Sequence, residues 1–291
     1  MMKLLSVSVG GTKVGGLQSF ASSVMTTHGY TPTIITGVSA GAILALPLAL
    51  GKHNEMEAIL TDLTLKDIFD VSPVKKKGGI SVKAIMRAIS GRNSFGKMGI
   101  RELLSSLVDE AEFEAYKKNK KSPRVFIQSV DFKTGSRVIN EVKDLSYDLW
   151  IEYTVASGSI PGFVEPVNLN GQILFDGGVR NASLAAWVME LYKPSHTVSI
   201  YSRPQDLSSV SDPSWKAGNV IAPITRALEI MMYEISKSDE EEERLIADKY
   251  ALRLQQGFLP VVMKGMFDVD KKRLSKLYEA GINQAHLMFK K

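Results

Sequence analysis

The sequence predicts an α/β fold in which neighbouring strands run parallel. Two short runs rich in apolar and β-branched residues, Lys3 to Val9 and Thr31 to Gly37, have the length of buried strands. A segment with helical spacing follows each run, from Leu17 to Gly29 and from Ser39 to Gly51. Because a strand–helix–strand order almost always forms a right-handed crossover, the two strands should lie parallel in one sheet.

Each of these two strands ends in a glycine-rich turn. The first is followed by Gly10 to Gly16, with the sequence G-G-T-K-V-G-G, and the second ends in Gly37 to Gly41, with the sequence G-V-S-A-G. Open α/β sheets bind their ligands at the carboxyl ends of their strands. Both turns are therefore expected at one functional edge of the sheet.

The rest of the chain continues with strands and helices and contains no internal repeat. A basic helical segment is predicted from Asn54 to Asp109, and two strands from Pro123 to Glu141 with a turn at Lys133 to Ser136. A helix then runs from Asp148 into a proline–glycine turn before Phe163. Two more strands are predicted from Gly171 to Asp176 and from His196 to Pro204. The remainder is predicted to be helical, with a methionine-rich amphipathic helix from Val220 to Ser236 and a terminal helix from Lys271 to Phe289. We expect a single domain over residues 1–291, with a helical C-terminal part over 219–291.

The composition is typical of a folded globular protein. Of the 291 residues, 44% are hydrophobic, and no apolar run reaches the roughly 18 residues needed to cross a bilayer. The absence of cysteine excludes a disulfide framework and thiolate catalysis, and is consistent with a reducing compartment. The apolar run at the start is too short for a secretory signal peptide. We expect a cytoplasmic protein that can lie at a membrane surface, and export by a route without a signal peptide stays open.

Charge is unevenly distributed along the chain, whose net charge is +5. Eight basic residues and no acidic one lie between Val71 and Arg101, while acidic residues gather in S-K-S-D-E-E-E-E-R-L around Glu240. The basic run is compatible with an anionic partner, such as lipid headgroups or nucleic acid. The alternative for each charged run is a solvated loop or helix face. We expect Val71 to Arg101 to flank the site and contact an anionic membrane surface, and we expect no nucleic-acid partner.

Ser39 lies at the centre of G-V-S-A-G, between a predicted strand and a predicted helix. The pattern G-x-S-x-G at such a turn is the nucleophile elbow, in which the serine backbone is strained and the residues two before and two after it lack side chains. Gly37 and Gly41 meet that requirement. The N–H groups at the start of the helix favour negative charge near the hydroxyl. The alternative is a packing turn without chemistry.

A serine nucleophile needs hydrogen-bond donors for the oxyanion that forms in the reaction. Backbone N–H groups of the loop from Gly10 to Gly16 are expected at the neighbouring strand end, where they can face that oxygen. The loop lacks the Lys-Ser/Thr pair of a phosphate-binding loop and does not match the dinucleotide pattern G-x-G-x-x-G. The sequence therefore favours an oxyanion loop over a phosphate loop.

The four histidines are poorly placed to act as the base. His28 ends a predicted helix, His53 follows one, His196 precedes a strand, and His286 lies on the last helix. No histidine–carboxylate cluster has the spacing of metal ligands, so we expect neither a metal nor another cofactor.

Asp176 is a better candidate for the base. It ends a predicted strand, and Gly177 and Gly178 follow it, which lets another backbone segment approach closely. An aspartate before glycine is also common in plain turns, which is the alternative.

Three features in this order resemble the patatin-like phospholipases: a glycine-rich loop after the first strand, G-x-S-x-G about 25 residues later, and D-G-G much further on. The run I-T-G-V-S-A-G-A-I-L-A-L-P-L-A-L resembles the elbow and helix of that family. The run V-A-S-G-S-I-P-G-F-V-E-P-V-N-L-N-G-Q-I-L-F-D-G-G-V-R-N-A-S-L resembles its segment around the catalytic aspartate. The resemblance covers Leu4 to Leu184.

The resemblance implies a three-layer α/β/α fold with a mostly parallel central sheet and a Ser–Asp dyad without histidine. Ser39 would be the nucleophile that attacks a fatty-acyl ester, and Asp176 would be the general base. An oxyanion hole would be formed by Gly10, Gly11 and Thr12.

The glycine loop departs from the family pattern. That pattern is usually G-G-G-x-(Arg/Lys)-G, with Lys13 at the basic position, whereas Val9 replaces its first glycine and Val14 follows the lysine. This departure alters the expected backbone path of the loop and leaves the Ser39–Asp176 pair intact.

We therefore expect a lipid acyl hydrolase of phospholipase A or lysophospholipase type that acts through an acyl-enzyme. Two alternatives stay open. One is an esterase with a Ser–Asp–His triad that uses His196 or His286, and the other is a catalytically silent member that binds lipid or a partner. The oligomeric state is not predicted.

Overall fold

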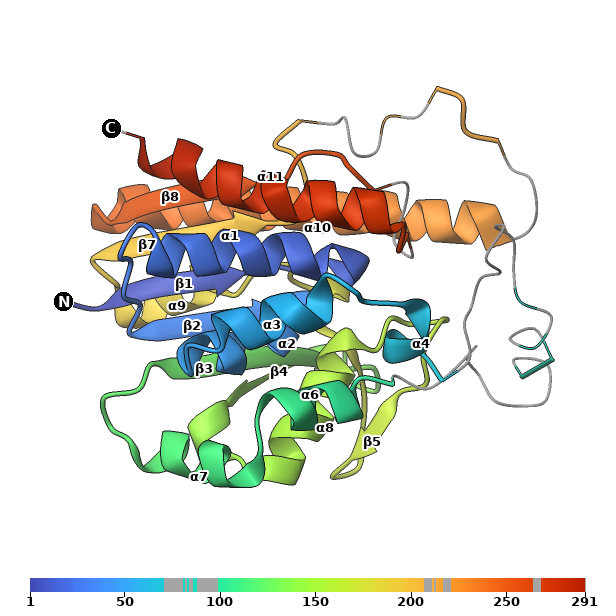
Figure 1. Cartoon of the computed structure of the whole chain (residues 1–291), viewed down its shortest axis with the longest axis horizontal. Coiled ribbons are helices and arrows are strands. Elements are labelled where there is room, and N and C mark those ends of the chain that lie inside the picture. Colours follow the sequence, from blue (N-terminus) through green and yellow to red (C-terminus); the bar gives the residue numbers. More distant parts are fainter. Residues whose placement is uncertain are drawn as a thin grey trace.

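The structure is a computed structural model of the 291-residue chain. It describes residues 1–70, 81, 83, 86–87, 99–206, 211, 213–216, 221–263 and 268–290. Figure 1 shows a central sheet with helices on both of its faces. The expected α/β/α architecture is confirmed.

The described strands form one sheet of eight, in the order β5-β6-β3-β2-β1-β7-β8, with β4 pairing along β3. The pairs β1–β2, β2–β3, β1–β7 and β7–β8 are parallel, and the pairs that involve β4, β5 and β6 are antiparallel. The strands are β1 (Lys3–Val7), β2 (Ile34–Val38), β3 (Arg124–Asp131), β4 (Ser136–Glu141), β5 (Val167–Leu169), β6 (Gln172–Asp176), β7 (His196–Tyr201) and β8 (Arg253–Phe258).

The helices are divided between the two faces of the sheet. One layer contains α1, α2, α3, α8 and α11, and the other contains α9 and α10 (Figure 1). The bounds are α1 (Val14–Thr26), α2 (Ala40–Ala49), α3 (His53–Leu60), α4 (Leu65–Ile68), α6 (Arg101–Leu107), α7 (Glu110–Lys118), α8 (Tyr147–Gly158), α9 (Ala185–Tyr192), α10 (Ile221–Tyr250) and α11 (Lys271–Phe289). Short 3-10 helices among the described residues, η1 (Gly11–Lys13), η2 (Val142–Asp144) and η3 (Gly177–Val179), join some of these elements.

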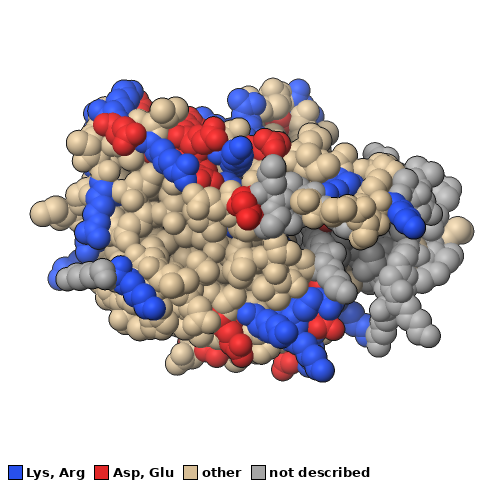
Figure 2. All heavy atoms as spheres, turned by 90° about the horizontal axis from the view of Figure 1, so that it is seen from above, with Lys and Arg blue, Asp and Glu red and all other residues tan. Residues whose placement is uncertain are grey.

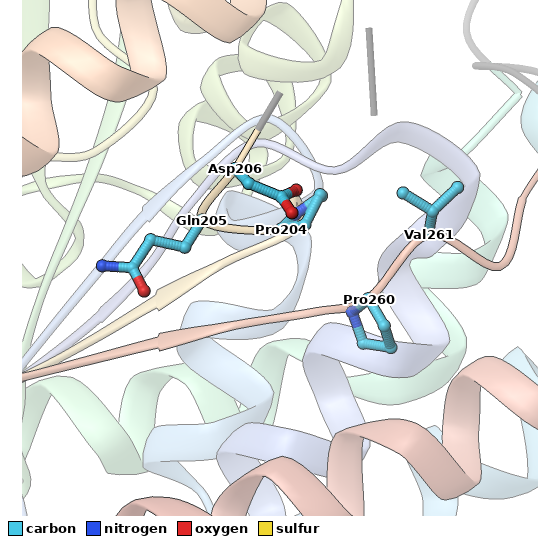
Figure 3. Close-up of a pocket in the computed structure, with 5 residues that line it drawn as sticks. All are labelled: Pro204, Gln205, Asp206, Pro260 and Val261. Carbon is cyan, nitrogen blue, oxygen red and sulfur yellow. The ribbon is translucent and has the colours of Figure 1, made fainter. Parts of the chain in front are cut away.

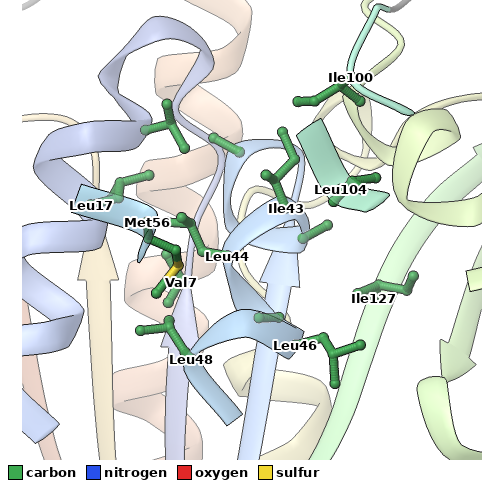
Figure 4. Packing of buried hydrophobic residues seen from close by; sticks show 14 of the residues in the cluster. Val7, Leu17, Ile43, Leu44, Leu46, Leu48, Met56, Ile100, Leu104 and Ile127 are labelled. Atoms are coloured by element: carbon green, nitrogen blue, oxygen red, sulfur yellow. The ribbon is translucent and has the colours of Figure 1, made fainter. Parts of the chain in front are cut away.

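Each face of the sheet has its own apolar core, because successive side chains of a strand point to opposite faces. Leu5 and Ile35 belong to the larger cluster on the α1–α2 side, while Leu4 and Ile34, one residue earlier, belong to the cluster on the α9–α10 side. Figure 4 shows the larger cluster, where leucines of α2 lie among residues of β1, α1 and β3. This burial on both faces explains why β1 and β2 have adjacent apolar residues and not an alternating pattern.

Several predicted elements differ from those observed. The helix predicted from Leu17 to Gly29 runs from Val14 to Thr26. The helix predicted from Val220 to Ser236 extends to Tyr250. The helical remainder also contains β8, which was not predicted because this edge strand has the mixed sequence R-L-Q-Q-G-F and is only partly buried. Its backbone hydrogen bonds to β7, and not an apolar pattern, define it as a strand.

β3 brings the ends of β2 and β6 together. Gln128 of β3 pairs with Val38, the last residue of β2, and the next residue, Ser129, pairs with Asp176, the last residue of β6. β4 occupies the other edge of β3, so β2 and β6 share one edge and meet end to end. Because β2 is parallel and β6 antiparallel to β3, both strands present their carboxyl ends at this junction, where Ser39 follows Val38.

Within the described residues, no helix is both long enough and apolar enough to cross a bilayer.

Candidate active site

Ser39 occupies a sharp turn between β2 and α2. Its backbone has φ 55° and ψ −118°, a region that non-glycine residues rarely adopt. Strain of this kind costs about 1–3 kcal/mol and is found mainly at functional positions. The side chain is buried, with 4% of its surface exposed. The backbone at Ser39 thus has the strain that the G-x-S-x-G pattern predicts for this turn.

Gly37 and Gly41 are needed because backbone segments pass too close for any side chain. A Cβ on Gly37 would overlap the carbonyl of Gly41, and a Cβ on Gly41 would overlap the carbonyl of Val7 in β1. Both residues have ordinary backbone angles, so steric space and not a positive φ requires glycine at these two positions.

The Ser39 hydroxyl donates a hydrogen bond to the carboxylate of Asp176, with 2.7 Å between Oγ and Oδ2. The other carboxylate oxygen, Oδ1, accepts the backbone N–H of Gly178 at 2.7 Å. Asp176 is 2% exposed, and burial raises its pKa to about 7, although both hydrogen bonds oppose this shift. The structure therefore brings together the two residues, 137 positions apart, that the sequence singled out.

The residues after Asp176 fit tightly against the neighbouring strands. A Cβ on Gly177 would lie 2.5 Å from the carbonyl oxygen of Gln128, and a Cβ on Gly178 would lie 2.6 Å from the Val9 side chain. The side-chain amide of Gln128 also donates to the Gly177 carbonyl at 3.1 Å. These contacts fix the direction in which the Asp176 carboxylate points.

Ser157, in the last turn of α8, was not predicted as a site residue. Its Oγ accepts the backbone N–H of Ser39 at 2.9 Å, which helps to hold the strained turn. The only sequence signal was the cluster of small residues around Ser157 and Gly158, and such clusters are also common at ordinary helix ends.

The glycine loop is shorter than its sequence suggests. Gly11 has φ 53° and begins the 3-10 helix η1, and α1 starts at Val14. Gly15 and Gly16 therefore belong to a helix and not to the expected loop from Gly10 to Gly16. A Cβ on Gly16 would lie 2.6 Å from Leu277 of α11, so helix packing explains this glycine.

Two of the three residues expected to form the oxyanion hole border the same space as Ser39. Gly11 and Thr12 line a pocket with Ser39, whereas Gly10 does not line it and is closely packed, because a Cβ on it would lie 2.5 Å from Leu17. The N–H of the preceding residue, Val9, is bonded to the Ala182 carbonyl at 3.0 Å. Gly11 and Thr12 are thus the two expected donors that border the pocket.

The pocket beside Ser39 is narrow and has apolar walls. The cavity between these walls has a volume of only about 40 Å³. The walls come from α2, α3, the segment around α4 and the turn after α8, and they include Ile43, Leu60, Leu63, Ile68, Phe69 and Ile160. Such a lining fits a hydrocarbon chain and offers few partners to a polar ligand.

The family model of the patatin-like phospholipases matches residues 5–186. The chain belongs to the patatin-like phospholipase family. Among solved structures, that of VipD from Legionella pneumophila is similar, with a TM-score of 0.51 and 12% identity. The similarity covers 99% of this chain and 66% of the VipD chain, and at this identity it supports the fold alone. No curated protein matches the sequence significantly.

In this patatin-like chain, Ser39 lies at the carboxyl ends of the parallel strands, and the histidines lie toward the opposite ends of these strands. His28 follows α1, which runs back from the carboxyl end of β1, and His196 begins β7. The four rings are engaged there in contacts of their own: His28 packs on His286 with ring centroids 5.1 Å apart, His53 bonds to Ser22, and His196 bonds to Gln255. In the described part of the chain, no histidine lines the pocket or bonds to the Ser39–Asp176 pair.

Lys13, which matches the basic position of the patatin-like loop, points away from the nucleophile. Its Nζ donates to the carbonyl oxygen of Ser202 at the end of β7, 3.1 Å away. Burial lowers the pKa of Lys13, and the Glu229 carboxylate opposes this shift. Lys13 thus ties η1 to β7.

A second hollow lies where the chain leaves β7 and β8 (Figure 3). It is wide and open, and Pro204, Gln205, Asp206, Pro260 and Val261 line it. Neither Ser39 nor Asp176 contributes to it, so we do not assign the patatin-like chemistry to this hollow.

The basic segment from Val71 to Arg101 lies largely outside the described residues, and so do Lys75, Lys76 and Lys77. Two of its arginines have carboxylate partners: Arg87 bonds to Asp70 and Glu165, and Arg101 forms a bidentate pair with Glu152. On the face shown in Figure 2, acidic and basic side chains are interspersed around a broad uncharged area. Among the described residues, no group of three or more potential ligands could hold a metal ion.

Proposed function

We propose that this member of the patatin-like phospholipase family is a lipid acyl hydrolase of phospholipase A or lysophospholipase type that works through a Ser39–Asp176 dyad. The observation that carries this proposal is the 2.7 Å hydrogen bond to a buried carboxylate from the hydroxyl of Ser39, a residue that lines an apolar pocket. Family membership supports lipid acyl hydrolysis in general, and the dyad and the type of lipase are our inference.

Asp176 is suited to act as the base because burial raises its pKa to about 7. A base is most effective when its pKa lies near the working pH, and burial gives this carboxylate a pKa in the range usual for imidazole. As Ser39 Oγ bonds to the carbonyl carbon of the ester, its proton passes to Asp176 Oδ2. The Gly178 N–H on Oδ1 keeps the carboxylate oriented during the transfer.

The tetrahedral intermediate carries negative charge on the former carbonyl oxygen. The N–H groups of Gly11 and Thr12 are our candidates to bind this oxygen, and one such donor lowers the barrier by about 3 kcal/mol. When the intermediate collapses, the C–O bond to the alcohol breaks and the alcohol takes the proton from Asp176. Water then attacks the acyl-enzyme in the same way, which releases the fatty acid and restores Ser39.

The apolar pocket is our candidate site for the acyl chain. Its side chains from α2 and α3 flank Ser39 on the side of the elbow where an ester carbonyl must approach. The free energy of burying the hydrocarbon chain, about 0.8 kcal/mol for each CH₂, would hold the ester in place. Neither alternative function has a comparable observation in its favour, because the histidines are distant from Ser39, whereas Asp176 is hydrogen-bonded to it.

The test is the release of fatty acid from mixed phospholipid micelles by the wild type, Ser39→Ala and Asp176→Ala. We expect turnover by the wild type and a loss of at least 1,000-fold in each variant, consistent with the losses seen on removing members of other catalytic constellations. Full activity in both variants would refute the dyad. A wild type without turnover on phospholipids, lysophospholipids and neutral acyl esters would support the silent alternative.

A further inference from the structure

The acidic run on α10 contains a buried carboxylate, Asp239, that no step of the proposed chemistry uses. Asp239 is 4% exposed and accepts three hydrogen bonds from the segment that follows the D-G-G turn. Its Oδ2 accepts the backbone N–H groups of Ala182 at 2.5 Å and Ser183 at 3.0 Å, and its Oδ1 accepts the side-chain amide of Asn181 at 2.9 Å. Carboxylates that accept several N–H groups in a buried place are strong anchors.

The segment held by Asp239 contacts both halves of the site. The Ala182 carbonyl accepts the N–H of Val9, the residue before Gly10, at 3.0 Å. On the other side, the Asn181 N–H donates to the Gly177 carbonyl at 3.1 Å, next to Asp176. The segment therefore lies between the candidate oxyanion loop and the candidate base.

One planar peptide group connects the Asp239 contact to the Val9 contact. The Ala182 carbonyl and the Ser183 N–H belong to the same peptide unit and point in opposite directions. Asp239 fixes the N–H end, so the carbonyl end is fixed against Val9. Hydrogen bonds joined through one peptide also polarise and strengthen each other.

Glu243, one turn further along α10, reinforces the same segment. Its Oε1 accepts the hydroxyls of Ser183 and Tyr201, both at 2.7 Å. The neighbouring Glu240 faces a different set of partners, because it pairs with Arg203 at 2.6 Å and with Arg244. Asp239 and Glu243 thus hold the 181–183 segment, whereas Glu240 does not.

We propose that Asp239 is a positioning residue, which sets the spacing between the loop that begins at Gly10 and the turn that carries Asp176. This inference rests on the proposed function for its effect on turnover. The link between Asp239 and Val9 stands independently of that function, and it can be measured in the protein without substrate.

The test compares Asp239→Ala with Glu240→Ala, a matched removal of a buried carboxylate from the same helix, and with Asp239→Asn. Three quantities are measured in the full chain: the exchange rate of the Val9 amide hydrogen, and kcat and KM on mixed phospholipid micelles. Asp239→Ala should speed Val9 exchange at least tenfold and lower kcat at least tenfold, with KM within threefold. Asp239→Asn should keep most of the wild-type Val9 protection and most of the wild-type kcat. The amide oxygen of the new side chain can accept both backbone N–H groups, and the Asn181 side-chain amide can flip to accept from its NH₂ group.

Glu240→Ala should lower the melting temperature and leave Val9 exchange and kcat within threefold of the wild type. Equal Val9 exchange in Asp239→Ala and Glu240→Ala would overturn the proposal, whatever the activity. If Asp239→Ala does not fold, Asp239→Ser takes its place, because the shorter side chain cannot accept both backbone N–H groups. Wild-type Val9 exchange and kcat in that variant would overturn the proposal as well. A wild type without turnover whose Val9 exchange still responds to Asp239 would refute the proposed function and leave the link intact.

Discussion

The buried carboxylate of Asp176 contacts Ser39, our proposed nucleophile, where many serine hydrolases use an imidazole. Burial raises the pKa of Asp176 to about 7, which suits this carboxylate to accept a proton near neutral pH. The backbone of Ser39 is strained, and this conformation is sterically feasible because a glycine lies two residues away on each side. At this scale, the candidate chemistry depends on how closely the backbone can approach these two side chains.

Ser157 offers a test of how much the elbow depends on support from outside the motif. Ser157→Ala removes the acceptor of the Ser39 N–H, and a hydrogen bond of this kind contributes about 0.5–1.5 kcal/mol. We expect kcat to fall about twofold to tenfold, measured by fatty-acid release at substrate saturation. Ser129→Ala is the matched control, because the buried Ser129 Oγ has no hydrogen-bond partner within the described structure. Equal effects of the two substitutions would argue against a role for Ser157.

Local motifs predicted Ser39 and Asp176, and distant contacts explain what the sequence left out. The elbow and the D-G-G turn are short patterns whose chemistry can be read from adjacent residues. Ser157, Gln128 and Asp239 act through hydrogen bonds to backbone atoms of residues that lie 49 to 118 positions away in the chain. No local pattern identifies such partners.

Among the elements, α10 departs furthest from expectation. Its acidic run was expected to be a solvated face, yet Asp239, Glu240 and Glu243 are buried against the sheet and η3. Their spacing of one and three residues places them on one side of the helix, and the partners that make this burial feasible come from β7, β8 and the 181–183 segment. A count of charges along the sequence cannot distinguish such a face from an exposed one.

The contact between α1 and α11 gives a second test at the element scale. A Cβ on Gly281 of α11 would overlap Ser19 Oγ and the Gly16 carbonyl of α1, so Gly281→Ala should force the helices apart and cost about 1–3 kcal/mol. Gly15→Ala is the matched control, since its Cβ would lie 3.6 Å from the nearest atom and alanine favours a helix by up to about 1 kcal/mol. Denaturant unfolding should show a loss for the first variant and no loss for the second. A stable Gly281→Ala would contradict the close packing.

At the scale of the whole molecule, the sequence predicted the parallel centre of the sheet and missed two of its strands. The apolar runs of β1 and β2 predicted parallel neighbours, and the register shows them paired from Leu4 with Ile34 to Val7 with Gly37. β8 and β5 lacked a pattern because one is a polar edge strand and the other has three residues. The junction of β2 and β6 on β3 depends on the topology of the sheet, which local periodicity does not determine.

Buried acids should make the stability of the whole molecule fall as the pH rises. Burial raises the pKa of Asp176 and Glu243 to about 7 and that of Asp239 to about 6. Between pH 4 and 7 the folded chain then holds protons that the unfolded chain has released, so these groups lower the free energy of unfolding with rising pH. Asp176→Asn, which carries no charge, should therefore gain more in melting temperature over the wild type at pH 8 than at pH 5. An equal difference at both pH values would contradict the raised pKa of Asp176.

The central claim is that proton transfer at Ser39 needs Asp176 and no imidazole. An activity that rises with an inflection near pH 7 would look like histidine, so the decisive measurement is the pH dependence of kcat/KM in a variant with His28, His53, His196 and His286 all replaced by glutamine. We predict that this variant keeps its turnover and its inflection near pH 7, because the group that loses the proton is the buried carboxylate. Loss of turnover in the folded variant, or loss of the inflection, would contradict the account.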